Sequence, residues 1–206
     1  MKRLLSWVAT LLLCCTVLGP ALAQEAADRK ADHEALRELL RTATEAINTR
    51  KFDLVAPRLH SSFTVIAVDN TKLVGIEAFR TYWNALFDGA NAPLVAVETR
   101  PVADELTFFL SDTVGVVYGT SQDTYTFHKN AVFAEGDKRS MNTRWSAAVI
   151  KEGEVWKLVN VHFSANPFDN PMLDVATGAV KKTALMAGIG GLVLGLVLMA
   201  LLRRRR

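Results

Sequence analysis

The C-terminal part of the chain constrains its organisation most, because residues 183–202 form a run of 20 residues without a charged side chain. A helix of that length rises about 30 Å, which matches the hydrocarbon thickness of a bilayer. Lys181 and Lys182 precede this run, and four arginines, residues 203–206, follow it. The sequence therefore predicts one transmembrane helix over residues 183–202, with the lipid bilayer as its partner, rather than a buried core helix.

The first residues have the pattern of a secretory signal peptide. Two basic residues precede an apolar stretch, residues 4–18, and residues 21–23 (Ala-Leu-Ala) place small side chains where the signal peptidase recognises them. We expect a signal peptide over residues 1–23 with cleavage after its last residue. An uncleaved signal anchor is the alternative, and Pro20 disfavours it because proline breaks a spanning helix.

Cysteine chemistry is not expected in the mature protein. Cys14 and Cys15, the only two cysteines in the sequence, both lie in the expected signal peptide. Leucines rather than small residues precede them, which disfavours lipidation. Cleavage would leave a chain that can form neither a disulfide nor a thiolate metal site.

Both ends of the chain predict the same orientation. The signal peptide exports the domain, and the arginines at 203–206 should stay in the cytoplasm, opposed weakly by the lysines at 181 and 182. We expect a single-pass protein of the cell (inner) membrane, with its soluble domain in the periplasm or outside the cell and its C-terminus in the cytoplasm. The alternative is that the helix and its arginines form a sorting signal that a processing enzyme removes.

Charge and composition indicate the properties of the exported part of the chain and its division into a leader, a domain and a tether. Sixteen of the 24 Lys and Arg residues and all 21 Asp and Glu residues lie in residues 24–180, so this part carries a net charge of −5 and should not bind nucleic acid. Residues 24–31 are expected to be a flexible leader, and residues 32–168 are long enough for one domain with its own core. Residues 169–182 hold few large apolar side chains and are expected to be a tether.

Hydrophobic periodicity predicts helices first and strands afterwards. Asp32 is the expected N-cap of an amphipathic helix, and Gly75 precedes a second one. Residues 69–72 have the composition of a hairpin turn. A first strand is expected over residues 62–68, and further strands over residues 94–100, 105–110, 113–127, 139–150 and 155–164. This order predicts an α+β fold in which a curved antiparallel sheet wraps around the N-terminal helices.

The last expected strand carries large apolar residues on both faces if it alternates regularly. Trp156 and Leu158 fall on one face, and Val159, Val161 and Phe163 on the other. An antiparallel sheet with one face in water should alternate between apolar and polar residues. We therefore expect the convex face to be covered by a partner subunit or by the C-terminal tail, and predict a homodimer through that face.

The sequence WKLVNVHFS at residues 156–164, followed by Pro167, resembles the last strand of the nuclear transport factor 2-like superfamily in its SnoaL-like branch. The sequence GIEAF at residues 75–79 resembles the start of the third helix of these domains. The superfamily also includes ketosteroid isomerases and the association domain of calcium/calmodulin-dependent protein kinase II. The resemblance implies a cone-shaped sheet whose open end forms a pocket, and homodimers that pair through their sheets.

The chain departs from the isomerases of that superfamily. Those enzymes use an acidic base together with an oxyanion hole made by a tyrosine and a protonated aspartate. Here residues 63–68 contain no acid, Asp69 lies in the expected turn, and the first helix has no tyrosine on its inner face. The isomerase roles therefore transfer to no residue of this chain, and no catalytic residue is assigned.

Five polar residues on the expected strands are the candidate ligand-binding residues of the pocket: His162, Ser164, Asn160, Tyr118 and Arg144. The first three alternate onto one face of the last strand, and a histidine there suits proton transfer near neutral pH. The alternatives are that His162 and Ser164 tie the sheet to a neighbouring loop, and that Arg144 lies on a solvated face.

Two functions remain open. The chain has no histidine pair at metal-ligand spacing, no Gly-rich phosphate loop and no Gly-x-Ser-x-Gly motif, so we expect neither metal nor cofactor. The preferred function is a membrane-anchored extracytoplasmic domain that binds an unknown small molecule or assembles, without catalysis. The alternative is a small-molecule isomerase or lyase with a pocket histidine as general base, which would need a second titratable group within reach.

Overall fold

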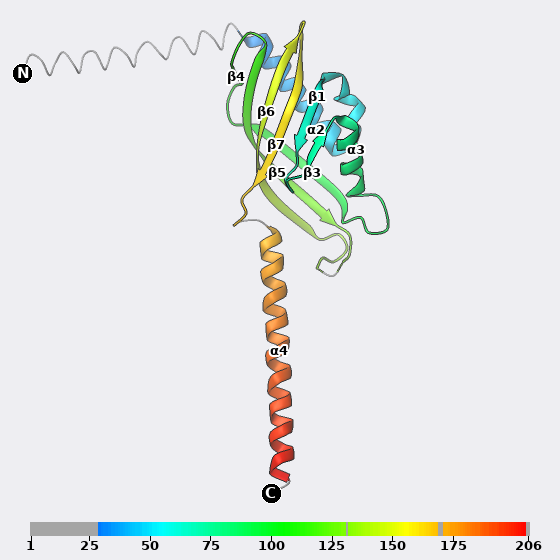
Figure 1. Cartoon of the computed structure of the whole chain (residues 1–206), viewed down its shortest axis with the longest axis vertical. Coiled ribbons are helices and arrows are strands. Elements are labelled where there is room, and N and C mark those ends of the chain that lie inside the picture. The colour runs from blue at the N-terminus through cyan, green and yellow to red at the C-terminus, as the bar shows by residue number, and fades with distance from the viewer. Residues whose placement is uncertain (1–28, 131, 169–170, 205–206) are drawn as a thin grey trace, which may run out of the picture.

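The computed structural model describes residues 29–130, 132–168 and 171–204 (Figure 1). It contains an α+β domain and a long C-terminal helix, which confirms the predicted fold class. The expected signal peptide, residues 1–23, lies outside the described residues. The helices of the domain are α2 (Lys30–Thr49), two 3-10 turns (Phe52–Leu54 and Ala56–Arg58) and α3 (Ile76–Ala85).

The N-cap of α2 lies three residues before the predicted one, so the predicted N-cap role of Asp32 is wrong. Arg29 holds the N-cap position and makes no side-chain cap hydrogen bond. Asp32 lies inside the first turn, where its Oδ1 accepts hydrogen bonds from Trp156 Nε1 at 2.8 Å and Lys151 Nζ at 3.0 Å. A carboxylate in the first turn favours the helix through the helix dipole. Here it also ties the helix to the sheet.

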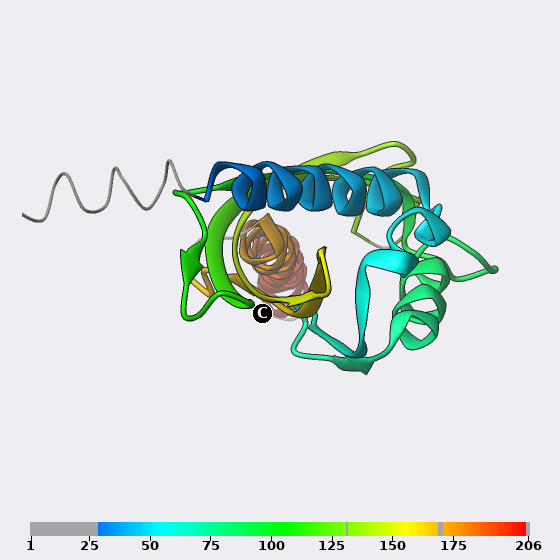
Figure 2. The same cartoon turned by 90° about the horizontal axis from the view of Figure 1, so that it is seen from above.

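The strands form one seven-stranded sheet in the order β2-β1-β7-β6-β5-β3, with β4 beside β5. Their bounds are β1 (Leu59–Ile66), β2 (Lys72–Val74), β3 (Leu94–Ala103), β4 (Phe108–Phe109), β5 (Val114–Phe127), β6 (Lys138–Glu152) and β7 (Val155–Ala165). The pairs are antiparallel except β1 with β7, which run parallel, so the sheet is mixed rather than wholly antiparallel. Figure 2 shows α2 lying across the concave side of the curved sheet.

A β-bulge in β7 changes which of its side chains face inward. Leu158 pairs with Val149 of β6 and Asn160 with the preceding Ala148, so Val159 is the extra residue. Because one residue is inserted, Val161 lies on the same face as Leu158 instead of the opposite one. The regular alternation expected from the sequence is therefore wrong, and the apolar residues of β7 no longer argue for a covered convex face.

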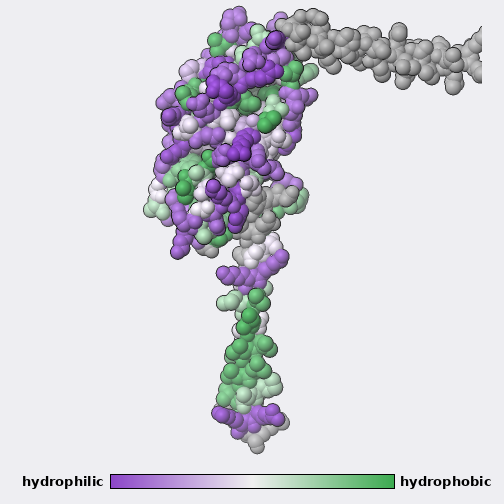
Figure 3. All heavy atoms as spheres, turned by 180° about the vertical axis from the view of Figure 1, so that it is seen from behind, coloured by the Kyte–Doolittle hydropathy of each residue, from purple (hydrophilic) through white to green (hydrophobic). Residues whose placement is uncertain are grey.

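Helix α4 (Pro171–Arg204) projects from the end of the domain at which β7 finishes. Within it, Val180–Arg204 is long and apolar enough to cross a membrane. Figure 3 shows a continuous apolar band along this helix with hydrophilic side chains at both ends. The helix also runs through most of the expected tether, residues 169–182, so the described part of that segment is helical.

Candidate ligand-binding cavity

A cavity of about 180 Å³ lies between α2 and the concave face of the sheet. Its wall is mainly apolar, with side chains from α2, α3 and the strands. Representative lining residues from these elements are Leu36, Phe63, Phe79, Val117, Ala147 and Phe163. An apolar cavity of about 150 Å³ stays dry and binds benzene. This cavity is therefore large enough for a molecule the size of one substituted aromatic ring.

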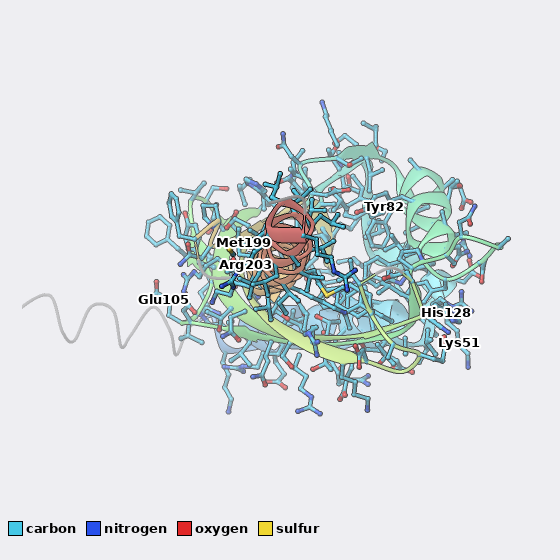
Figure 4. All side chains as sticks on the ribbon, turned by 90° about the horizontal axis from the view of Figure 1, so that it is seen from below. Lys51, Tyr82, Glu105, His128, Met199 and Arg203 are labelled. Atoms are coloured by element: carbon cyan, nitrogen blue, oxygen red, sulfur yellow. The ribbon has the colours of Figure 1, made fainter. Side chains whose placement is uncertain are left out.

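The cavity reaches the surface between α2 and the segment that joins β3 to β4. Among its lining residues, the exposed ones are Arg37 on α2 and Glu105 and Leu106 on that segment. Figure 4 shows Glu105 at the edge of the domain. A ligand would thus enter past one positive and one negative side chain, and would then meet an apolar interior.

Beside the cavity, three buried hydroxyl residues form a network around the buried Asp123. The hydroxyls of Thr99 and Ser121 donate to Asp123 Oδ1 at 2.5 and 2.6 Å, and the Thr143 hydroxyl donates to Oδ2 at 3.1 Å. Asp123 is 6% exposed and its three partners are at most 8% exposed. A buried carboxylate requires such compensation, because removing a charge from water is costly. Thr99 also lines the cavity, so the network and the cavity share a wall.

Two partly buried tyrosines, Tyr82 and Tyr125, remain protonated at neutral pH. Burial, followed by a hydrogen bond to Asp69, raises the pKa of Tyr82 to about 12. Burial, followed by the negative charge of Asp123, raises the pKa of Tyr125 as well. Tyr82 projects from α3 (Figure 4). Both phenols can therefore donate a hydrogen bond, and neither can act as a general base at neutral pH.

His33 is the histidine that the fold brings to the cavity. It lies on α2, is 7% exposed, and its ring centroid is 5.1 Å from that of Phe109. His33 was not singled out from the sequence, although it precedes the apolar Leu36 and Leu39 by three and six residues. That helical spacing was the signal that His33 faces inward.

The five candidate residues from the sequence lie on the convex face of the sheet. Tyr118 on β5 pairs with Ser146 on β6, which in turn pairs with His162 on β7. Arg144 on β6 pairs with Ser164 on β7. The fold thus brings the strands of the candidate residues side by side. None of the five lines the cavity, because their alternate neighbours on β5, β6 and β7 face inward.

Two of these residues make polar contacts of their own with neighbouring segments. Arg144 forms an ion pair with Asp104, with 2.5 Å between the guanidinium nitrogen and the carboxylate oxygen. The Asn160 side chain donates a hydrogen bond of 3.1 Å to the backbone carbonyl of Thr64 on β1. The His162 side chain is exposed on this face.

Sequence reasoning missed the network around Asp123. Within the expected strand over residues 113–127, Gly115, Gly119, Ser121, Asp123 and Tyr125 fall on one face, because they are separated by even numbers of positions. The alternation alone could have shown that an acid and a tyrosine accompany the glycines to the concave side. The glycines themselves face inward, where Gly119 lies against the indole of Trp145.

Solved structures similar to this one show the fold. A hexachlorocyclohexane dehydrochlorinase (LinA) type 2 matches with a TM-score of 0.57 and 12% identity, covering 68% of this chain and 88% of that chain. The type 3 enzyme from Novosphingobium barchaimii LL02 matches with a TM-score of 0.55 and 11% identity, covering 68% and 90%. A conserved protein from Planctomyces limnophilus DSM 3776 matches with a TM-score of 0.55 and 13% identity, covering 68% and 99%.

Comparison by sequence is more specific than the shared fold. The chain matches no curated protein. A family model described as the SnoaL-like domain matches residues 36–168. That range contains most of α2, the whole sheet and every lining residue of the cavity except His33, and it ends before α4. The resemblance noted from the last strand is thereby confirmed, and the chain belongs to the SnoaL-like domain family.

Proposed function

We propose that the soluble domain binds a small apolar molecule in the cavity beneath α2, and that α4 anchors this domain to a membrane. The observation that carries the proposal is the apolar wall, which encloses a volume of about 180 Å³. Burying an apolar ligand there would remove its surface from water at a gain of roughly 25 cal/mol per Å².

The distribution of titratable groups supports binding without catalysis. Among the described residues that line the cavity, Arg37 and Glu105 are exposed at the mouth, and His33 is the buried titratable residue. Asp123 accepts hydrogen bonds from three hydroxyls and lies behind Thr99. Acid–base catalysis needs positioned groups within reach of the reacting atoms. An apolar chamber with one histidine suits a receptor or carrier better.

We propose further that the domain is exported and that its C-terminus stays in the cytoplasm. This proposal rests on the N-terminal sequence pattern and on the four arginines after the apolar run. N-terminal sequencing of the membrane-purified protein should give a start near Gln24. A start at Met1 would reject cleavage. A homodimer through the convex face is a proposal from the family resemblance, and analytical ultracentrifugation in detergent would test it.

The binding proposal is tested with toluene as the probe and two matched variants. Ala147 lines the cavity and the neighbouring Ala148 lies on the other face of β6. Ala147→Phe should fill the cavity and abolish saturable toluene binding by the full chain in amphipol, whereas Ala148→Phe should retain it. Equal binding by both variants, or no binding by the unaltered chain, would reject the cavity as a ligand site.

A second function is favoured by one observation, the position of His33 in the cavity wall. A buried histidine beside an apolar ligand could remove a proton while a leaving group departs, as a lyase requires. Two structural neighbours are hexachlorocyclohexane dehydrochlorinases by name. The test is chloride release when the full chain is incubated with hexachlorocyclohexane. Release that does not exceed that of a His33→Ala variant would reject this function for that substrate.

A further inference from the structure

Thr99 belongs both to the cavity wall and to the hydrogen-bond network around Asp123. It lines the apolar cavity, and its hydroxyl oxygen lies 2.5 Å from Asp123 Oδ1 and 3.0 Å from Ser121 Oγ. Most of the residues that line the cavity are apolar, so a lining residue that is hydrogen-bonded to a buried carboxylate is an exception among them. Ligand sites commonly combine an apolar wall with a few placed polar groups that fix orientation.

The number of protons in the network determines whether the Thr99 hydroxyl can donate or accept a further hydrogen bond. Each hydroxyl has one proton and two acceptor lone pairs. The Thr99 and Ser121 protons both point to Asp123 Oδ1, so Ser121 has no proton left to donate to Thr99. The Thr99 oxygen is thus left as an acceptor. Donating its own proton to a carboxylate polarises the hydroxyl and strengthens that acceptor.

The position of Thr99 is fixed by the backbone. Asn48 on α2 donates from its side-chain nitrogen to the Thr99 carbonyl at 3.0 Å, and its side-chain oxygen accepts from the Thr99 N–H at 2.8 Å. On the strand side, Thr99 pairs with Asp123 in the β3–β5 register. Contacts from the helix and from the sheet therefore both fix this residue. Ligand binding then costs little further conformational entropy at Thr99.

We propose that Thr99 Oγ1 accepts a hydrogen bond from the ligand of this cavity, which makes the ligand class a neutral, ring-sized apolar molecule with one hydrogen-bond donor, such as a phenol. This inference rests on the proposed binding function and adds the specificity of the site. The carboxylate of Asp123 behind Thr99 disfavours an anionic ligand, because like charges repel at short range. Thr99 is then the residue that selects a hydroxyl over a methyl group.

The experiment compares phenol with toluene, which have nearly the same shape and differ in the donor. Titration calorimetry of the full chain in amphipol would give both affinities. The unaltered chain should bind phenol at least as tightly as toluene. In Thr99→Val the phenol hydroxyl is buried without a partner, so phenol affinity should fall about tenfold or more while toluene affinity is kept. Thr99→Ser should restore phenol binding, and Thr120→Val on the exposed face of β5 is the matched control.

The outcomes separate this inference from the binding proposal. The unaltered chain could bind toluene but bind phenol more than about tenfold more weakly. That result would mean that the phenol hydroxyl is buried without a partner, so it would overturn the role of Thr99 and leave the apolar site intact. An equal loss of phenol and toluene in Thr99→Val, with Thr99→Ser not restoring phenol, would overturn it as well. Absence of toluene binding by the unaltered chain would reject the cavity itself.

Discussion

The indole N–H of Trp156 donates a hydrogen bond of 2.8 Å to the carboxylate of Asp32, which joins the first turn of α2 to the last strand of the sheet. The Lys151 ammonium reaches the same carboxylate oxygen at 3.0 Å. Trp156 is 1% exposed, and its ring packs 5.4 Å from that of Phe109. The helix that covers the cavity is therefore held at its N-terminal end by a charged and partly buried contact.

This contact predicts a stability that depends on pH. Burial, the largest single influence, raises the pKa of Asp32, but hydrogen bonds from Trp156, Lys151 and Arg29 together lower it below the ordinary value. A lowered folded-state pKa contributes stability above the unfolded value of about 4, and that stability is lost as the pH falls through the folded-state pKa.

Asp32→Asn should accordingly lose about 1.5–3 kcal/mol of unfolding free energy at pH 7, because a hydrogen-bonded charge is removed. The difference between the variant and the unaltered chain should shrink at pH 3. Urea unfolding of the full chain in detergent, followed by tryptophan fluorescence at both pH values, measures this difference. A difference that is the same at pH 7 and pH 3 would contradict the role of the Asp32 charge.

Gly119 on β5 should not tolerate a side chain. An added Cβ would overlap the indole of Trp145 and the backbone carbonyl of Val102, and a backbone atom cannot move aside easily. Gly119→Ala should therefore cost about 1–3 kcal/mol of unfolding free energy. Thr120→Ala, one residue later on the exposed face, serves as the control for a change in the same strand. Equal midpoints for the two variants in urea would argue against the close packing at Gly119.

His162→Ala should change the stability little. His162 is exposed on the convex face, and surface substitutions usually stay within about 0.5 kcal/mol. A buried histidine with a polar partner would instead cost roughly 1–3 kcal/mol when removed. Thermal melts of the variant and the unaltered chain distinguish these values. A melting temperature lowered by several degrees would show that His162 has a buried partner after all.

Removal of the apolar part of α4 should release the domain from membranes. The fragment of residues 24–180 keeps all the described strands and loses the apolar run of residues 183–202. After a carbonate wash it should be found in the supernatant, with the full chain in the pellet. The far-ultraviolet spectrum of the released fragment should show both helix and strand. A fragment that stays in the pellet would mean that another segment holds the domain at the membrane.

The sequence was sufficient to predict the order of the elements and the apolar faces of α2 and α3, because helical periodicity is a local property. It was not sufficient for β7, where Val159 forms a bulge that depends on pairing with β6. The bulge reverses the facing of Val161 and Phe163. No local pattern marks such an insertion, so the prediction of two apolar faces followed from a regular alternation that the strand does not have.

The polar network had the same dependence on long-range pairing. Asp123 could be placed on the inner face of β5 from its spacing to Gly119. Its partners could not, because Thr99 lies opposite Asp123 only in the β3–β5 register, and Thr143 lies opposite Ser121 only in the β5–β6 register. These contacts join residues that are 24 and 20 positions from Asp123.

The central claim, that the space beneath α2 is a ligand site, is tested most directly by a crystal structure of the full chain soaked with iodobenzene. Anomalous scattering would locate the iodine without relying on shape alone. The account predicts an iodine peak inside the cavity, in contact with side chains such as Val117 and Ala147, and no such peak in Ala147→Phe. Iodine found along α4 or on the domain surface, with the cavity unoccupied at saturating iodobenzene, would contradict it.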